Sequence, residues 1–159
     1  MKRKQREYPM GSVSSGTMRE ADLIPAFVDA LEEQIKQTPR WRQNKVHKQM
    51  VRVIRQSMKD EAYFQSDAAC YDNEGLFIAL DDYSAPYFYF GSLLGGDADY
   101  GWWLSEDFEA DFDGSPRYQD LSEVPKDFEG ELAIVNDHGN VSLYHKARTQ
   151  PPRLIWSLV

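Results

Sequence analysis

The stretch that decides the fold reads YFYFGSLLGGDADYGWWL and covers residues 87–104. Aromatic residues crowd both of its ends, as is typical of β-strands, and its glycine-containing middle is typical of a turn. The stretch therefore predicts a β-hairpin. Further along the chain, apolar runs at 131–135 and 141–145 flank a polar turn and predict a second hairpin, and residues 154–159 predict a last strand.

Before residue 86 the apolar residues recur at helical spacing instead. This periodicity predicts three helices, at 22–37, at 39–58 and from a cap at Asp72 or Asn73 to about Tyr83, with 60–71 ambiguous. Helices followed by hairpins predict an α+β fold, with N-terminal helices packed on a C-terminal antiparallel sheet. We expect a flexible basic lead-in at 1–16 and a single domain at 17–159, helical over 17–84 and mainly β over 86–159.

The charge of the chain is divided between its two ends. The formal net charge is −8, but residues 1–59 hold 13 Lys/Arg against 6 Asp/Glu, and residues 60–159 hold 5 against 20. Such asymmetry indicates a partner for one half, or pairing of the halves with each other. A single cysteine and the lack of an apolar run of roughly 20 residues predict a protein of the cytosol with no membrane partner.

Four carboxylates alternate with apolar residues near the middle of the acidic half, at Asp107, Glu109, Asp111 and Asp113. In an extended chain this period of two places all four on one face, about 6.6–6.8 Å apart. That distance is close to every second phosphate of a DNA strand, at about 3.4 Å each. The row therefore predicts a surface that occupies a site built for a nucleic-acid backbone; the alternative is a solvated edge strand whose charges discourage aggregation.

The same stretch approaches the pattern of a calcium-binding loop. Glu109, Asp111, Asp113 and Gly114 match positions 1, 3, 5 and 6 of that pattern, and Asp120 matches position 12. Position 1 is normally Asp and position 12 a bidentate Glu, and no flanking helices are evident. We therefore expect no metal and no cofactor, with a weak calcium site at 109–120 left open.

The predicted second helix has one basic face. At 100° per residue, five cations fall within an arc of roughly 80°: Lys45, Lys48, Arg52, Arg55 and Lys59. The apolar residues of the other side are Val46, Met50, Val53, Ile54 and Met58. The cations could contact phosphates, and Trp41 and the pair Trp102 and Trp103 could stack on bases. The alternative for the pair is a place in the core, since paired aromatics in a strand more often fill one. The alternatives for the cations are a solvated helix face, or one docked on the acidic segment.

Residues for catalysis are poorly represented. The sequence has no GxSxG elbow, P-loop, HExxH or CxxC motif. Its three histidines lie in separate contexts, and Cys70 is interpreted as a small buried apolar residue rather than a nucleophile. We assign no catalytic residue and expect a protein that is not an enzyme.

Two blocks of the chain suggest a relationship. They are GSVSSGTMR at 11–19 leading into DLIPAF at 22–27, and YFG at 89–91 followed by GDADYGW at 96–102. Together they resemble small acidic proteins of bacteriophages, plasmids and other mobile elements. The resemblance implies a mobile-element accessory protein in a host bacterial cytosol, and such proteins often act on host proteins.

The leading hypothesis is therefore a non-enzymatic interaction protein that binds and inhibits a host protein through its acidic surface. A nucleic-acid-binding or defence enzyme, such as a CRISPR effector, is the candidate target, which would make the chain an anti-CRISPR. One alternative is a nucleic-acid-binding accessory factor that uses the basic helix. A structural assembly component is the other.

Overall fold

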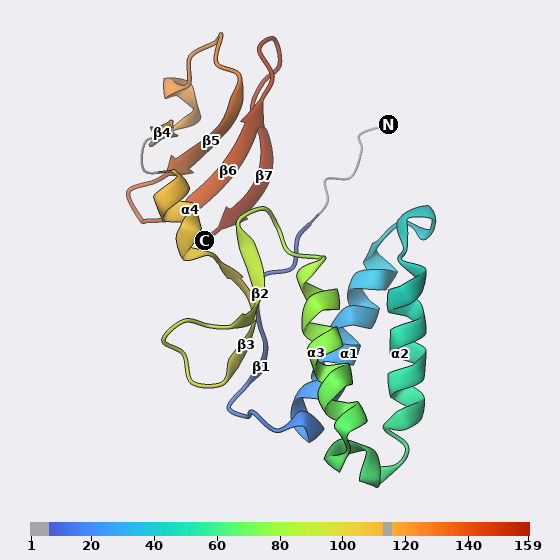
Figure 1. Ribbon diagram of the computed structural model, residues 1–159. Coiled ribbons are helices and arrows are strands. Elements are labelled where there is room, and N and C mark those ends of the chain that lie inside the picture. Colours follow the sequence, from blue (N-terminus) through green and yellow to red (C-terminus); the bar gives the residue numbers. More distant parts are fainter. Residues whose placement is uncertain (1–6, 113–115) are drawn as a thin grey trace. The chain divides into compact units, whose positions relative to one another are not determined.

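The computed structural model describes residues 7–112 and 116–159 and has the predicted α+β fold (Figure 1). The chain divides into two compact units, one over Tyr8–Leu104 and the other containing Ser105–Val159. The sequence predicted a single domain with one sheet. The structure differs because the 87–104 hairpin takes its third strand from near the N-terminus, whereas the 131–145 hairpin belongs to a separate sheet.

Three helices pack together in the first unit, and α1 (Glu20–Gln37) lies at their centre. Its apolar face is fully buried at Ile24, Phe27 and Leu31. Helix α2 (Lys45–Ser57) follows the short 3-10 turn η1 (Arg40–Arg42), where a continuous helix from 39 was expected. None of the described helices is long and apolar enough to cross a bilayer.

Helix α3 (Asp67–Asp81) begins five residues before the predicted cap, after a second 3-10 turn, η2 (Glu61–Gln65). The reason is local. The side chain of Ser66 accepts a hydrogen bond from the backbone N–H of Ala69, so Ser66 is the N-cap instead of Asp72 or Asn73.

The sheet of the first unit has three antiparallel strands in the order β1-β3-β2. The predicted hairpin is confirmed as β2 (Phe88–Ser92) and β3 (Asp99–Leu104). Strand β1 (Gly11–Ser15) pairs with β3, so the expected flexible lead-in at 1–16 is wrong for these residues. The pairing depends on Gly101, because a Cβ there would lie 2.1 Å from the carbonyl oxygen of Gly11.

Aromatic rings join this sheet to the helices. The ring of Phe27 lies 5.0–6.0 Å, centroid to centroid, from the rings of Phe77, Phe90 and Tyr100, each in an edge-to-face arrangement. The indole N–H of Trp102 donates to the carbonyl of Leu80 at 3.0 Å. The aromatic strands predicted from the sequence therefore contribute to the core of the first unit together with the helices.

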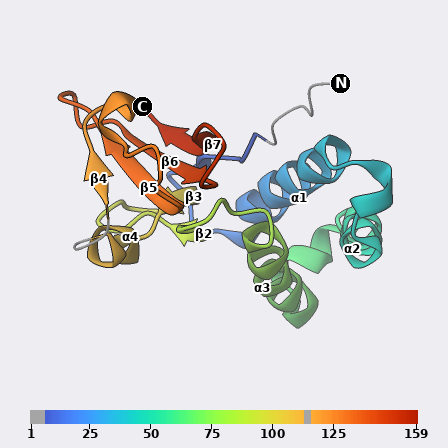
Figure 2. The same cartoon turned by 90° about the horizontal axis from the view of Figure 1, so that it is seen from above.

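The second unit holds a short helix, α4 (Glu106–Asp111), and a sheet in the order β4-β5-β6-β7 (Figure 2). Strands β5 (Gly130–Val135) and β6 (Val141–Lys146) confirm the second predicted hairpin. Strand β7 (Arg153–Leu158) confirms the predicted last strand. The two-residue strand β4 (Arg117–Tyr118) runs parallel to β5, so this sheet is mixed rather than fully antiparallel.

A buried lysine fastens the loops of the second unit. Lys146 is 6% exposed, and its Nζ donates to the carbonyls of Lys126 at 2.6 Å and Phe128 at 3.0 Å. The carbonyls of Ala147 and Arg148 lie 3.4 Å away. Burying a charge is costly unless hydrogen bonds compensate for the lost water, and these carbonyls supply them.

The close approach of β1 and β3 predicts opposite effects for two glycine substitutions. Gly101→Ala should lower the free energy of unfolding by about 3 kcal/mol, because the new methyl group overlaps the backbone of β1. Gly75→Ala in α3 should raise it by up to about 1 kcal/mol, since its Cβ meets only Met50 Cε at 3.5 Å and alanine favours helix. Denaturant unfolding followed by tryptophan fluorescence measures both values; equal stabilities of the two variants would contradict the packing of β1.

Candidate functional site: the basic face of α2

Helix α2 turns a different side to the core than its apolar pattern predicted. Ile54 is buried as expected, but Val46 and Val53 are 68% and 46% exposed. His47 and Val51 take their place in the core. The helix is thus rotated about its axis relative to the expectation.

The cause of this rotation is a polar contact that joins α2 to the end of α3. His47 Nδ1 lies 2.9 Å from the hydroxyl of Tyr83, and its Nε2 lies 3.1 Å from Asp82 Oδ2. Asn44, the N-cap of α2, approaches the same Nε2 at 3.4 Å. With both of its ring nitrogens in contact with polar groups, His47 can be buried without an unsatisfied group. The rings of His47 and Tyr83 are both buried, so this cluster joins the two helices and does not offer a binding site to solvent.

The five predicted cations do not remain equivalent in the structure. Arg55 binds Asp29 at 2.8 Å and Glu32 at 3.0 Å, both on α1. Desolvation opposes ionisation of Glu32, but the charges of Arg55 and Lys36 outweigh it and lower the pKa of that carboxyl. Arg55 is therefore neutralised within its own unit and is removed from the candidate site.

The other four cations are exposed on the outer side of α2 and just beyond its end, and we call them the basic face: Lys45, Lys48, Arg52 and Lys59. Among the described residues none of them has a carboxylate within ion-pair distance. Arg52 donates to Gln49 and Lys59 to Gln56, both neutral amides. These four charges are thus available to an external anion.

The turn before α2 adds further charge and an exposed ring. Arg40 and Arg42 are exposed, and Trp41 is 80% exposed. The guanidinium of Arg42 lies 4.9 Å from the ring centroid of Trp41, a cation–π distance. Trp102 and Trp103 lie in strand β3, and their indole N–H groups bond to backbone carbonyls. Of these three tryptophans, Trp41 presents the ring that a base could stack on.

The segment expected to carry the acidic row is not extended where the structure describes it. Residues 106–111 form helix α4, capped by the hydroxyl of Ser105, and Asp113 lies outside the described residues. The prediction of one carboxylate face at Asp107, Glu109, Asp111 and Asp113 required an extended chain. Because Glu106–Asp111 is an α-helix, in which positions two apart are separated by about 200° around the axis, the expected extended conformation is wrong for these residues. Phe108 and Phe112 are four residues apart and pack at 4.6 Å, and the ring of Phe108 lies 5.4 Å from that of Trp156. Burial of this pair favours the helix.

The residues of the calcium pattern do not gather into a described site. Asp113 and Gly114 lie outside the described residues, and Asp120 caps the turn η3 (Leu121–Glu123) by accepting from the backbone N–H of Ser122. Hydrogen bonds from Ser122 lower the pKa of Asp120. Within residues 7–112 and 116–159, no group of three or more His, Cys, Asp or Glu side chains is placed to hold a metal ion.

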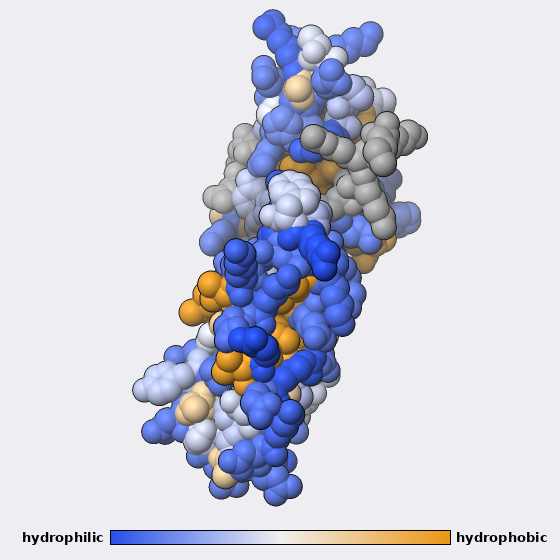
Figure 3. All heavy atoms as spheres, turned by 90° about the vertical axis from the view of Figure 1, so that its right-hand side faces the viewer, coloured by the Kyte–Doolittle hydropathy of each residue, from blue (hydrophilic) through white to orange (hydrophobic). Residues whose placement is uncertain are grey.

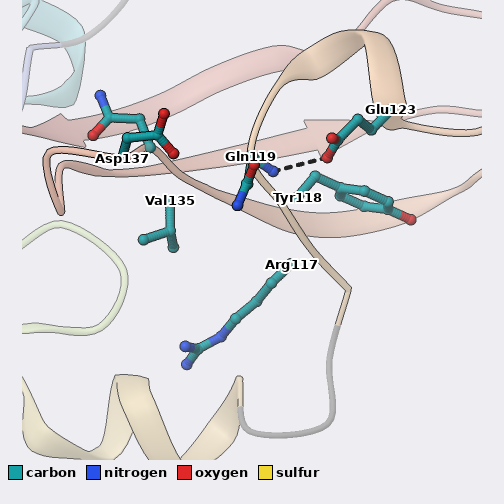
Figure 4. Close-up of a pocket in the computed structure, with 7 residues that line it drawn as sticks. Arg117, Tyr118, Gln119, Glu123, Val135 and Asp137 are labelled. Carbon is teal, nitrogen blue, oxygen red and sulfur yellow. Dashed lines mark hydrogen bonds between the residues drawn. The ribbon is translucent and has the colours of Figure 1, made fainter.

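The second unit has an open, polar pocket of about 460 Å³ (Figure 4). Its lining includes Arg117 and Tyr118 from β4 and Val135 and Asp137 from the end of β5 and the turn after it. The backbone N–H of Gln119 donates to Glu123 at 2.9 Å along one wall. Sequence reasoning missed this pocket because its two segments are brought together only by the parallel pairing of β4 with β5.

Cys70 is exposed near the start of α3, so its interpretation as a buried apolar residue is wrong. Local desolvation and the negative charges of Glu20 and Glu74 raise the pKa of its thiol. A nucleophilic cysteine needs a lowered pKa, since the thiolate is the reactive form. The structure therefore gives Cys70 the opposite electrostatics to those of a catalytic thiol.

Comparison of the chain with protein-family models, with curated proteins and with solved structures gives no significant match. The function is therefore argued from the residues and their geometry.

The environment of Cys70 predicts slow alkylation. At pH 7.5 a raised pKa leaves less thiolate, so iodoacetamide should react with Cys70 more slowly than with a free cysteine derivative. Glu20→Gln combined with Glu74→Gln should accelerate the reaction, whereas Glu33→Gln, on the same helix as Glu20, serves as the control. Mass spectrometry of timed samples gives the rates, and a wild-type rate at or above that of the free thiol would refute the assignment.

Proposed function

We propose that this chain is a non-enzymatic binding protein that contacts the phosphate backbone of a nucleic acid through the basic face of α2. The observation that carries the proposal is that Lys45, Lys48, Arg52 and Lys59 are exposed and have no carboxylate partner among the described residues. Phosphate contacts by Lys and Arg supply most of the affinity of sequence-independent binding.

The spacing of the basic face suits a phosphate chain. Lys45 and Arg52 are separated by seven residues, which is about 10 Å along a helix at 1.5 Å per residue. This length corresponds to about three nucleotides at 3.4 Å each. The exposed ring of Trp41, just before the helix, adds a stacking surface of the kind that single-stranded nucleic acids use.

The acidity of the chain does not oppose this proposal. Residues 34–59 contain eight Lys or Arg residues and no Asp or Glu. The carboxylates of Asp29 and Glu32 on α1 bind Arg55, which is not part of the basic face. Exposed charges act over about 8–10 Å at moderate salt, so a local cluster governs contact with a phosphate. Binding by this face is therefore expected to be strongest at low ionic strength.

Binding to a host protein through the acidic surface remains a second candidate. It keeps one supporting observation, since Glu106 and Asp107 are exposed on α4. The spacing that suggested mimicry of phosphates no longer supports it, because α4 is a helix. An origin in a mobile element and a role in inhibiting a CRISPR effector stay predictions of the sequence.

Salt-dependent binding tests the basic face. The wild-type protein should bind a fluorescent single-stranded oligonucleotide with a slope of log K against log salt near −3, since four contacts at about 0.7 each are lost to counterions. Lys48→Glu combined with Lys59→Glu should weaken binding at least about tenfold and reduce the slope by about half. Fluorescence anisotropy at several salt concentrations measures both quantities.

A matched control makes the same change of charge elsewhere. Lys126→Glu combined with Arg148→Glu alters two exposed cations of the second unit and should leave both the affinity and the slope unchanged. Equal loss in the two double variants would indicate a response to net charge alone, and no binding by the wild type at low salt would reject nucleic acid as the partner.

A further inference from the structure

Helices α2 and α3 run antiparallel, and we call the strip of surface between their axes, from Val46 and Val53 to Tyr71 and Ile78, the groove. His47, near the start of α2, meets Asp82 at the end of α3, and further along α2 the Cε of Met50 lies 3.5 Å from the position of a Cβ on Gly75. The two helices run in opposite directions, so residue numbers that rise along α2 fall along α3 (Figure 1). The contact of Met50 places it at the same height as Gly75. Both residues are half-buried and form the floor of the groove.

The rims of this groove are apolar and open to solvent. On α2 they are Val46 and Val53, which are 68% and 46% exposed. On α3 they are Tyr71 and Ile78, which are 73% and 71% exposed. In each pair the two residues are seven apart and therefore share one side of their helix. Figure 3, viewed from the side on which α2 lies, shows hydrophobic patches between hydrophilic ones on this face.

Opposite charges flank the two rims. Lys45 and Arg52 lie beyond the valines on the outer side of α2, and Asp67 and Glu74 lie beyond Tyr71 and Ile78 on the outer side of α3. Within the described parts of the chain neither of these two carboxylates has a cation at ion-pair distance. Across the groove the face thus changes from positive through apolar to negative.

We infer that this face is a homodimer interface, in which a two-fold axis runs along the groove. An interface between identical copies must be self-complementary, because each patch meets its own image. A two-fold axis along the groove places α2 of one copy against α3 of the other. It leaves the position of each residue along the groove unchanged, so residues at the same height in the two copies meet. An axis across the groove would instead set α2 against α2, with Lys45 and Arg52 facing like charges.

The levels of the two helices make the pairing specific. Counting in opposite directions from Met50 and Gly75, Val46 comes within one residue of the level of Ile78 of the second copy, and Val53 within one residue of the level of its Tyr71. Arg52 likewise comes within one residue of the level of its Glu74. Apolar residues therefore meet apolar residues. The positive side of each copy meets the negative side of the other, and the two-fold symmetry produces this contact twice.

The distribution of charge selects a second copy over other occupants. An anionic lipid surface or a nucleic acid would match the α2 side but be repelled by Asp67 and Glu74. An acidic peptide would meet the same repulsion. The interface shares Lys45 and Arg52 with the basic face. Its other parts are the apolar rims and α3, which the basic face does not include, so dimerisation is measured without nucleic acid and can hold where nucleic-acid binding fails.

Sedimentation equilibrium without nucleic acid tests this interface by reversal of charge. Arg52→Glu and Glu74→Arg should each raise the dimer dissociation constant at least about tenfold, because each sets like charges opposite each other. Combining the two substitutions should restore dimerisation to within about threefold of the wild type. Lys48→Glu, on the side of α2 away from α3, is the matched control and should leave the constant unchanged.

Ile78→Arg provides a second test, since a cation at the apolar rim should abolish the dimer while leaving the circular-dichroism spectrum and melting temperature of the folded chain intact. All positions changed are exposed, so these substitutions should leave the fold intact. The spectrum and the melting temperature identify any variant that unfolds and so separate loss of folding from loss of the interface. A wild-type protein that is monomeric up to about 1 mM, or a dimer that neither charge reversal weakens, would overturn the inference.

Discussion

Burial of Phe27 is the constraint on which the first unit depends. Its ring is fully buried and touches Phe77 on α3, Phe90 on β2 and Tyr100 on β3. Such aromatic pairs contribute about 0.5–1.5 kcal/mol beyond the burial of their area. One side chain of α1 therefore fixes a helix and two strands that are distant in sequence, and the close approach of β1 to Gly101 completes the sheet they form.

Helix α2 is outside this aromatic cluster and is held differently. It contributes Val51 and Ile54 to the core, and polar contacts supply the rest of its attachment, at His47 to α3 and at Arg55 to α1. Because these contacts determine the rotation of the helix, they also determine what it exposes. The valines of the groove and the cations of the basic face reach solvent for the same reason, which is that His47 occupies the core position.

The second unit shows how local spacing can support two structures. Phe108 and Phe112 are four residues apart, so they lie on one side of a helix, but residues an even number apart also share one face of a strand. The sequence favoured the strand because charged and apolar residues alternate. The cap supplied by Ser105 and the packing of Phe108 on Trp156 favour the helix, and the second of these contacts joins residues 48 positions apart.

The sequence by itself determined the α+β class, the two hairpins, the approximate helices and the placing of five cations on one arc. These features depend on residues within a few positions of each other, where periodicity is informative. Only the tertiary structure decided that Arg55 is neutralised by Asp29 and Glu32, that β1 joins β3, that the chain forms two units, and that two valines face solvent. Each of these outcomes depends on a contact between residues far apart in the chain, and local periodicity carries no information about such contacts.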